Sequence, residues 1–202
     1  MDNVSHPGLE CAHGLSLWVE ACSHRFLFDL GPDAGFIENA KRLGIDVSLA
    51  EFAVLSHAHD DHGGGLAAFL ELCPGSPVYL RRGGFEPRWS RPAPGVKRNI
   101  GLDPQLADGG RIIYTGAEHK IAEGLTLFSG VRGRELFSPA NRVLFGPDGE
   151  TPDDFSHEQN LLIEEDGKRV LIDGCAHCGI LNILSRCAEL CPQPPQDVVG
   201  GF

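Results

Sequence analysis

Three imidazoles and the Asp61 carboxylate lie close together in the stretch Ser56-His57-Ala58-His59-Asp60-Asp61-His62-Gly63. So many polar side chains cannot point into an apolar core without partners. His57 and His59 are two positions apart on an extended segment, so they project to the same side and can hold one ion. Asp61 and His62 follow where the chain turns into a helix, and can reach a second ion. Because zinc takes imidazole nitrogen and carboxylate oxygen as ligands, this stretch predicts a site for one or two zinc ions or other divalent metals.

The residues on either side support this reading. An apolar strand, Phe52-Ala53-Val54-Leu55, leads into the motif, and glycines follow it. The alternative is a solvated histidine-rich turn. The strand and the glycines disfavour that alternative because they fix a ligand loop at the end of a strand.

The remaining pattern alternates strands with helices. Apolar runs predict strands, and apolar residues at helical spacing predict helices. Asp166-Gly167 is a strong hairpin signal between two of these strands. The fold class is therefore layered α/β or α+β. The expected strands are 15–19, 25–29, 52–55, 78–80, 111–114, 125–128, 161–163 and 170–172, and the expected helices are 36–43, 66–72 and 179–190.

Composition narrows the class of protein. The 202 residues suit one domain spanning residues 1–202, and the net charge of −11 argues against nucleic-acid or anionic-membrane partners. No apolar run is long enough to cross a membrane, and the first residues lack the features of a secretory signal. We therefore expect a cytoplasmic protein, either a monomer or an oligomer.

The cysteines do not form a disulfide framework, since seven is an odd number. Most should be buried thiols, with one available as a metal ligand. Cys175/Cys178 and Cys187/Cys191 have a spacing that also allows a structural zinc site. Helical spacing after Gly179 disfavours that site because it turns Cys187 inward.

The His-x-His-x-Asp-His motif after an apolar strand resembles the signature of the metallo-β-lactamase superfamily. That resemblance implies an αββα sandwich. The upstream strand ending Phe28-Asp29-Leu30-Gly31 is similar to one in the same superfamily, which implies that Asp29 holds the ligand loop without binding metal. Further similarity points to the subgroup that resembles 7,8-dihydropterin-6-ylmethyl-4-(β-D-ribofuranosyl)aminobenzene 5′-phosphate synthase. The segments that carry it are 12–16, 39–46, 152–159 and 174–183.

The resemblance also bears on the remaining ligands. His177 follows a predicted strand, and we expect it to be the next metal ligand. Cys175 lies near the position where many members place an aspartate ligand, and it is either a ligand or a buried thiol. Asp173 and His157 are weaker candidates, and His13 is expected to line the cleft.

Basic residues gather between Arg81 and Arg98 in this acidic chain. Interleaved prolines predict a stiff loop there. Guanidinium groups clamp anions well, so Arg81, Arg82 and Arg88 are expected to bind an anionic substrate. The alternative is a solvated loop that pairs with neighbouring acids.

These observations predict a zinc-dependent, hydrolase-type enzyme in which Asp61 also acts as the catalytic residue that orients the reacting water. The resemblance implies a small phosphorylated substrate similar to those of pterin chemistry. One rival is a di-iron redox protein, which would carry a glutamate where His59 stands. Another is a nuclease or phosphodiesterase, and a third is a non-catalytic metal-binding fragment.

The C-terminal sequence Val198-Val199-Gly200-Gly201-Phe202 suggests the third rival, a non-catalytic metal-binding fragment. In the resembling family a further C-terminal segment supplies the last histidine ligand. We therefore expect the sandwich to lack that segment and to expose a sheet edge.

Overall fold

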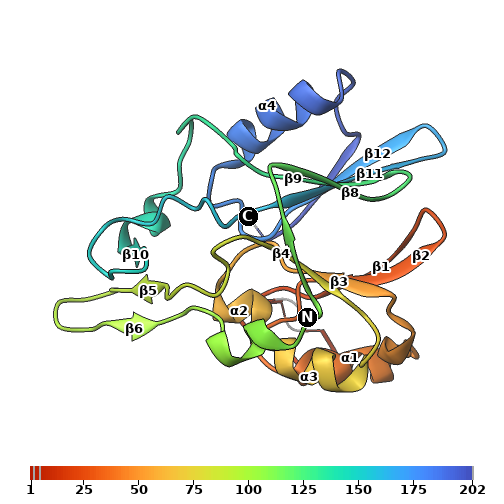
Figure 1. The fold of residues 1–202 in the computed structure, drawn as a ribbon, viewed down its shortest axis with the longest axis horizontal. Coiled ribbons are helices and arrows are strands. Elements are labelled where there is room, and N and C mark those ends of the chain that lie inside the picture. Colours follow the sequence, from red (N-terminus) through yellow and green to blue (C-terminus); the bar gives the residue numbers. More distant parts are fainter. Residues whose placement is uncertain (2, 5, 202) are drawn as a thin grey trace.

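The computed structural model describes residue 1, residues 3–4 and residues 6–201; of the expectations above, only the final Phe202 lies outside them. Two five-stranded sheets pack face to face, with helices on both outer faces (Figure 1). This confirms the predicted αββα sandwich. A small third sheet projects from one end of the sandwich (Figure 1).

The first sheet has the order β1-β2-β3-β4-β7. Its first two strands form an antiparallel hairpin, and the other neighbouring pairs are parallel. Two helices, α1 (Gly35–Arg42) and α3 (Leu66–Leu72), cover its outer face (Figure 1). The strands are β1 (Leu17–Ala21), β2 (His24–Phe28), β3 (Phe52–Val54), β4 (Val78–Arg81) and β7 (Ile112–Thr115).

The second sheet has the order β13-β12-β11-β9-β8, and only β12 and β13 run parallel. Helix α4 (Ile180–Leu190) covers its outer face (Figure 1). The edge strands are β13 and β8. The strands are β8 (Glu118–Ala122), β9 (Leu125–Phe128), β11 (Asn160–Glu165), β12 (Lys168–Ile172) and β13 (Asp197–Val199).

Alternation along the strands builds the layers. Phe26 and Phe28 of β2 pack between the sheets, while Leu27 faces α1 and α3. On β11, Leu161 likewise packs between the sheets and Leu162 packs toward α4. Successive side chains of a strand point to opposite faces, so each buried strand joins two of the three core layers.

Most of the predicted strand bounds differ from the structure by one or two residues, and two of these differences lie near the metal motif. The first strand begins at Leu17 rather than Leu15. Asp29 lies outside β2 because its φ of +59° is left-handed, which ends the extended conformation. This turn points the Asp29 side chain toward Ser56 and His62 of the metal motif.

The lobe is our name for the part that projects from the sandwich, residues 84–100 and 131–152. It carries the third sheet, of order β10-β5-β6 (Figure 1). Its strands are β5 (Trp89–Ser90), β6 (Arg98–Asn99) and β10 (Leu144–Phe145). Two residues are too few for a periodic signal, so the sequence did not predict them. Residues 81–98 were expected to form a stiff loop rather than a helix; they contain no helix, but they form β5 and the start of β6.

Short segments connect the layers. The predicted hairpin turn joins β11 to β12, with Asp166 and Gly167 both at positive φ. The remaining helix is α2 (Asp60–Gly63), and three 3₁₀ segments are η1 (Val47–Leu49), η2 (Pro104–Asp108) and η3 (Pro139–Val143). Within the described part of the chain, no helix has both the length and the apolar character needed to cross a membrane. All seven cysteines are free thiols.

Candidate metal centre

The metal motif connects β3 to α2, and Asp29 fixes its shape. Asp29 is fully buried at the end of β2, next to β3 in the sheet. Its Oδ1 accepts a hydrogen bond from the Ser56 backbone N–H at 2.7 Å. Its Oδ2 accepts from the Ser56 hydroxyl at 2.7 Å and from His62 Nδ1 at 2.6 Å. Asp29 therefore contacts both ends of the motif, as expected for a residue that holds the ligand loop.

Three imidazoles converge on one point. His57, His59 and His177 each offer an Nε2 atom that is buried and has no hydrogen-bond partner. Their ligand atoms lie within 4.8 Å of one another. A buried polar atom left unpaired costs about 1–3 kcal/mol, so three at one place are unfavourable unless a cation binds them. Three imidazoles are also a common donor set for zinc, so these residues fit a metal ion.

Hydrogen bonds at the opposite ring nitrogens orient two of these imidazoles. His57 Nδ1 lies 2.8 Å from the Ser56 hydroxyl oxygen, which already donates its own hydrogen to Asp29. His57 Nδ1 must therefore be the donor. His177 Nδ1 donates to Asn141 Oδ1 at 2.8 Å, and the Asn141 amide donates back to the His177 carbonyl. Such contacts fix the tautomer that leaves the Nε2 lone pair free for a metal.

A second group lies beside the first. Cys175 Sγ is 3.1 Å from His62 Nε2, and both can share an ion with His57. Asp61 lies next to this group, with its Oδ2 3.5 Å from His62 Nε2 and 3.4 Å from His13 Nε2. Thiolate and imidazole are both zinc ligands. The arrangement thus brings Cys175 into the centre that the sequence assigned to histidines and Asp61.

The protonation of the site follows from burial and neighbouring charges. Burial, followed by the adjacent imidazoles, lowers the pKa values of His57 and His59 well below the usual range. Burial also lowers the pKa of His177 to about 3. Burial opposes the charge of His62, but the Asp29 carboxylate still raises its pKa well above the usual value. The first three imidazoles are thus neutral and ready to ligate, whereas a metal at His62 must compete with a proton.

Burial also raises the pKa of Asp61. This shift makes its carboxylate a better proton acceptor near neutral pH than an exposed aspartate.

The two weaker candidate metal ligands, Asp173 and His157, differ in their surroundings. Asp173 is fully buried with both carboxylate oxygens unpaired, and its pKa rises to about 8 through burial, Glu158 and Asp29. It belongs to no metal-ligating group among the described residues. His157 does share a group with His59 and Asp153, but both of its ring nitrogens already contact protein atoms.

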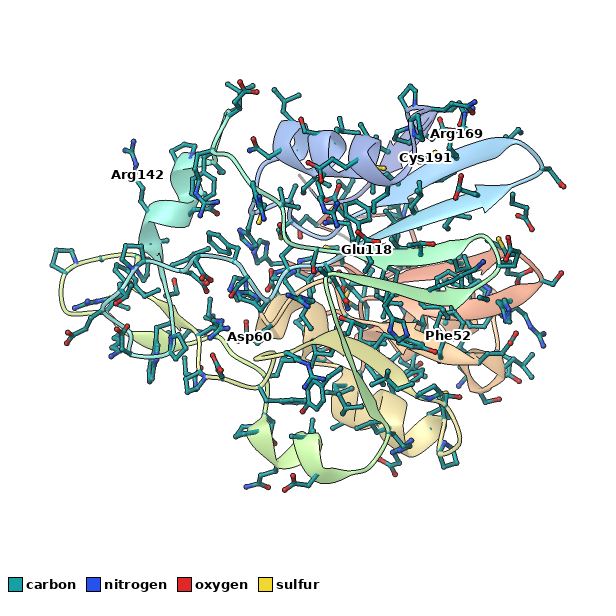
Figure 2. The ribbon with its side chains drawn as sticks, turned by 45° about the horizontal axis from the view of Figure 1, so that its top comes forward. Phe52, Asp60, Glu118, Arg142, Arg169 and Cys191 are labelled. Atoms are coloured by element: carbon teal, nitrogen blue, oxygen red, sulfur yellow. The ribbon has the colours of Figure 1, made fainter. Side chains whose placement is uncertain are left out.

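A cleft of about 820 Å³ opens onto this centre. At one end it is lined by metal-motif and neighbouring residues, among them the predicted His13. The opposite wall is formed largely by the lobe. Figure 2 shows Asp60 of α2 at the end of the sandwich from which the lobe extends. The lining residues on that wall include Ser90, Arg98, Ile100, Leu136, Ser138 and Leu144.

The predicted substrate-binding arginines lie outside this cleft. Arg88 is buried and pairs with Asp153 through its Nε at 3.4 Å. Arg81 donates to backbone carbonyls of Thr115 and Ser156, and Arg82 lines a separate shallow pocket. Arg98, from the same basic cluster, does line the cleft and pairs there with Asp60. Within this cluster, Arg81 and Arg88 therefore make structural contacts, and Arg98 faces the cleft.

Residues 10–156 match the family described as the metallo-beta-lactamase superfamily. The chain belongs to this superfamily. Its sandwich, with histidine and cysteine groups at one end of the sheets, indicates divalent-metal binding. This confirms the family that the metal motif predicted.

Two curated relatives and one solved structure are similar along most of the chain. The uncharacterized protein MJ0448 of Methanocaldococcus jannaschii is 27% identical, over 100% of this chain and 77% of its own length. The 7,8-dihydropterin-6-methyl-4-(beta-D-ribofuranosyl)-aminobenzene-5'-phosphate synthase of the same organism is 24% identical, over 94% of this chain and 70% of its own length. The crystal structure of Tm1679, a metal-dependent hydrolase of the beta-lactamase superfamily, aligns with 31% identity and a TM-score of 0.83, over 100% of this chain and 73% of that one.

Some residues that shape the site were not predicted. Asn141 lies in η3 and orients His177, but a single asparagine in a loop carries no local signal. Glu158 accepts the His177 backbone N–H at 2.7 Å and the Cys178 N–H at 2.9 Å. The sequence offered one signal for Glu158: it lies in the segment 152–159, which resembles the family.

Proposed function

We propose that this protein is a zinc-dependent, hydrolase-type enzyme that acts on a small phosphorylated molecule. The observation that carries the proposal is the set of three buried, unpartnered Nε2 atoms of His57, His59 and His177, the last two from residues that line the cleft. A zinc ion bound by these residues would supply Lewis acidity and would activate water near neutral pH.

The chain's own residues supply positioning and proton transfer. His57 and His177 keep their Nε2 lone pairs free through bonds at Nδ1. Asp61 lies at the cleft surface, 3.4 Å from His13 Nε2, with a raised pKa. In that place its carboxylate orients the attacking water and accepts its proton.

Two observations support a phosphorylated substrate. One relative that aligns over most of this chain is named as a synthase of a 5'-phosphate compound. Arg98 faces the cleft, and its side chain is 68% exposed. Its guanidinium can exchange Asp60 for a phosphate oxygen, since charge-assisted hydrogen bonds favour both partners. The net charge of −11 supports a small molecule over a nucleic acid.

The first experiment measures metal content after purification without chelator. Wild-type protein is expected to carry about one to two zinc ions per chain, and His59→Ala and His177→Ala each remove ligands and lower that number. His119→Ala is the matched control because His119 packs against Tyr79, with ring centroids 5.3 Å apart, and does not line the cleft. Its zinc content should equal that of the wild type.

A folded wild-type protein with less than about a tenth of a metal ion per chain would contradict the proposal. Full zinc content in His177→Ala would remove His177 from the centre. The zinc-loaded protein is then tested on p-nitrophenyl phosphate and bis(p-nitrophenyl) phosphate. Zinc binding without hydrolysis of either ester favours the non-catalytic metal-binding alternative.

A further inference from the structure

Residues 153–159, which we call the clamp segment, contact both ligand loops of the metal centre. Phe155 stacks on His177, with ring centroids 4.6 Å apart and planes 8° from parallel. Glu158 accepts the backbone N–H of His177, and the Gln159 backbone N–H donates to the Ser56 carbonyl at 2.7 Å. His157 reaches the metal motif itself. One irregular segment thus sets the distance between the motif and His177.

The hydrogen bonds of His157 assign its tautomer. Its Nδ1 accepts the backbone N–H of Ala58 at 3.0 Å, so this nitrogen carries no hydrogen. Its Nε2 then carries the hydrogen and donates to Asp153 Oδ2 at 3.2 Å. Both ring nitrogens are engaged with protein atoms, unlike the free Nε2 atoms of His57, His59 and His177. A metal ion could bind His157 only after one of these buried bonds broke.

Asp153 is itself committed to protein contacts. Its Oδ2 lies 3.4 Å from Arg88 Nε, and the side chains of both residues are at most 3% exposed. Its Oδ1 accepts the Phe155 backbone N–H at 2.9 Å. Arg88 donates in turn to the carbonyls of Pro87 and Gly83. Breaking a buried pair of this kind leaves an uncompensated charge in the core, so the geometry opposes the use of Asp153 as a ligand.

We propose that His157 is a positioning residue that holds Ala58, the residue between His57 and His59, through a buried relay from Arg88 and Asp153. The ligand atoms of His59, Asp153 and His157 are close enough to share an ion. The hydrogen bonds of the relay occupy both ring nitrogens of His157 and so disfavour metal binding there. The proposal explains why Arg88 is buried although most of its basic cluster is exposed. It rests on the metal centre proposed above, and its test has readouts besides activity.

The first test uses wild-type protein and nuclear magnetic resonance. Long-range ¹H–¹⁵N spectra of the metal-free protein should show His157 protonated at Nε2. After loading with ¹¹³Cd²⁺, His57, His59 and His177 should show coupling to cadmium and His157 none. Cadmium coupling to His157, or a hydrogen on its Nδ1, would overturn the relay. Protein that takes up no cadmium overturns the metal centre instead, and the metal-free tautomer then decides the relay alone.

The second test compares His157→Asn with His157→Ala. The Asn Oδ1 occupies nearly the place of His Nδ1 and can accept the Ala58 N–H, whereas Ala leaves that buried donor unpaired. Outer contacts of metal ligands change affinity by roughly 10–100-fold. We expect His157→Ala to weaken zinc binding within that range, and His157→Asn to recover most of it.

Both variants should keep the wild-type number of ions per chain and the visible absorption spectrum of the cobalt-loaded protein. His119→Asn controls for loss of an imidazole elsewhere. If His157 is a ligand, Asn fails to rescue, an ion is lost and the cobalt spectrum changes, and these results would refute the proposal.

Discussion

The two walls of the cleft are built in opposite ways. At the metal end, His57, His59 and His62 are at most 3% exposed, and each lies in a network of buried hydrogen bonds or ligand groups. In the lobe, Leu136 is 82% exposed and Arg98 projects from a two-residue strand. One wall is part of the sandwich core, and the other is formed by exposed residues of the lobe (Figures 1 and 2).

This contrast separates two tasks. A metal centre needs ligands held within a fraction of an ångström, which buried side chains with fixed hydrogen bonds provide. Recognition of a substrate can use an exposed, adjustable surface, because loops tolerate change without loss of the core. We therefore infer that the sandwich wall, braced by the buried lobe residues Arg88 and Asn141, sets the chemistry, and that the exposed residues of the lobe select what is bound.

Close backbone approach adds to the rigidity of the sandwich wall. A Cβ atom on Gly174 would lie 2.2 Å from Ser56 Oγ and 3.1 Å from His57 Nδ1. A Cβ on Gly14, whose φ is +133°, would lie 1.9 Å from the Asp61 carbonyl oxygen. Only glycine fits at such contacts, so the segments that carry Cys175 and His13 pack directly on the metal motif.

The largest effect is expected from Asp29→Asn. Asparagine tolerates the left-handed backbone of this position, but its amide replaces one acceptor oxygen that serves Ser56 and His62. We expect the free energy of unfolding to fall by about 3 kcal/mol, together with a clear loss of zinc affinity. Urea unfolding and metal titration of the same sample measure both.

Asp33→Asn is the control for this substitution. Asp33 lies in the adjacent loop and accepts one exposed backbone N–H, from Gly35. It should change stability by less than about 1 kcal/mol and leave zinc affinity unaltered. Equal losses in the two variants would mean that the sandwich wall is no more tightly held than the surface.

Arg98→Ala tests the other wall. Loss of this guanidinium should raise KM for a phosphate ester about tenfold, equivalent to ~1.4 kcal/mol, with kcat and thermal stability little changed. Arg142→Ala is the matched control, since Arg142 is an exposed lobe arginine that does not line the cleft (Figure 2). A loss of kcat at constant KM would mean that the lobe takes part in the chemistry.

The same contrast explains what could be predicted from sequence. The metal motif and its strand are local signals, and the family resemblance extended them to Asp29 and His177. The roles of Asn141 and Arg88 depend on contacts between segments 36 and 65 positions apart, His177 with Asn141 and Asp153 with Arg88. No local pattern in the sequence encodes such pairs. The sequence therefore led to the expectation that Arg88 binds substrate, whereas its side chain is buried in the structure. The short strands of the lobe were not predicted for a related reason. They form by pairing between segments and show no periodic pattern in the sequence.

The smallest effect concerns the turn in the lobe that contains Asp148. Asp148 accepts hydrogen bonds from the backbone N–H groups of Glu150 and Thr151 and from the Thr151 hydroxyl. The hydrogen bond from the Thr151 hydroxyl contributes most, followed by these backbone bonds, and together they lower the pKa of Asp148 from 3.8 to about 2.

A carboxyl group with a depressed pKa stabilises the fold above its unfolded pKa, and that stability is lost as the pH falls through the folded value. Asp148→Asn should therefore slightly lower the unfolding temperature at about pH 6, and the difference should shrink below about pH 4 and vanish near pH 2. Because the Asp148 carboxyl group is fully exposed and does not line the cleft, zinc affinity should not follow this titration. A parallel change in zinc affinity would show that the two walls are coupled, and the division of tasks between them would then fail.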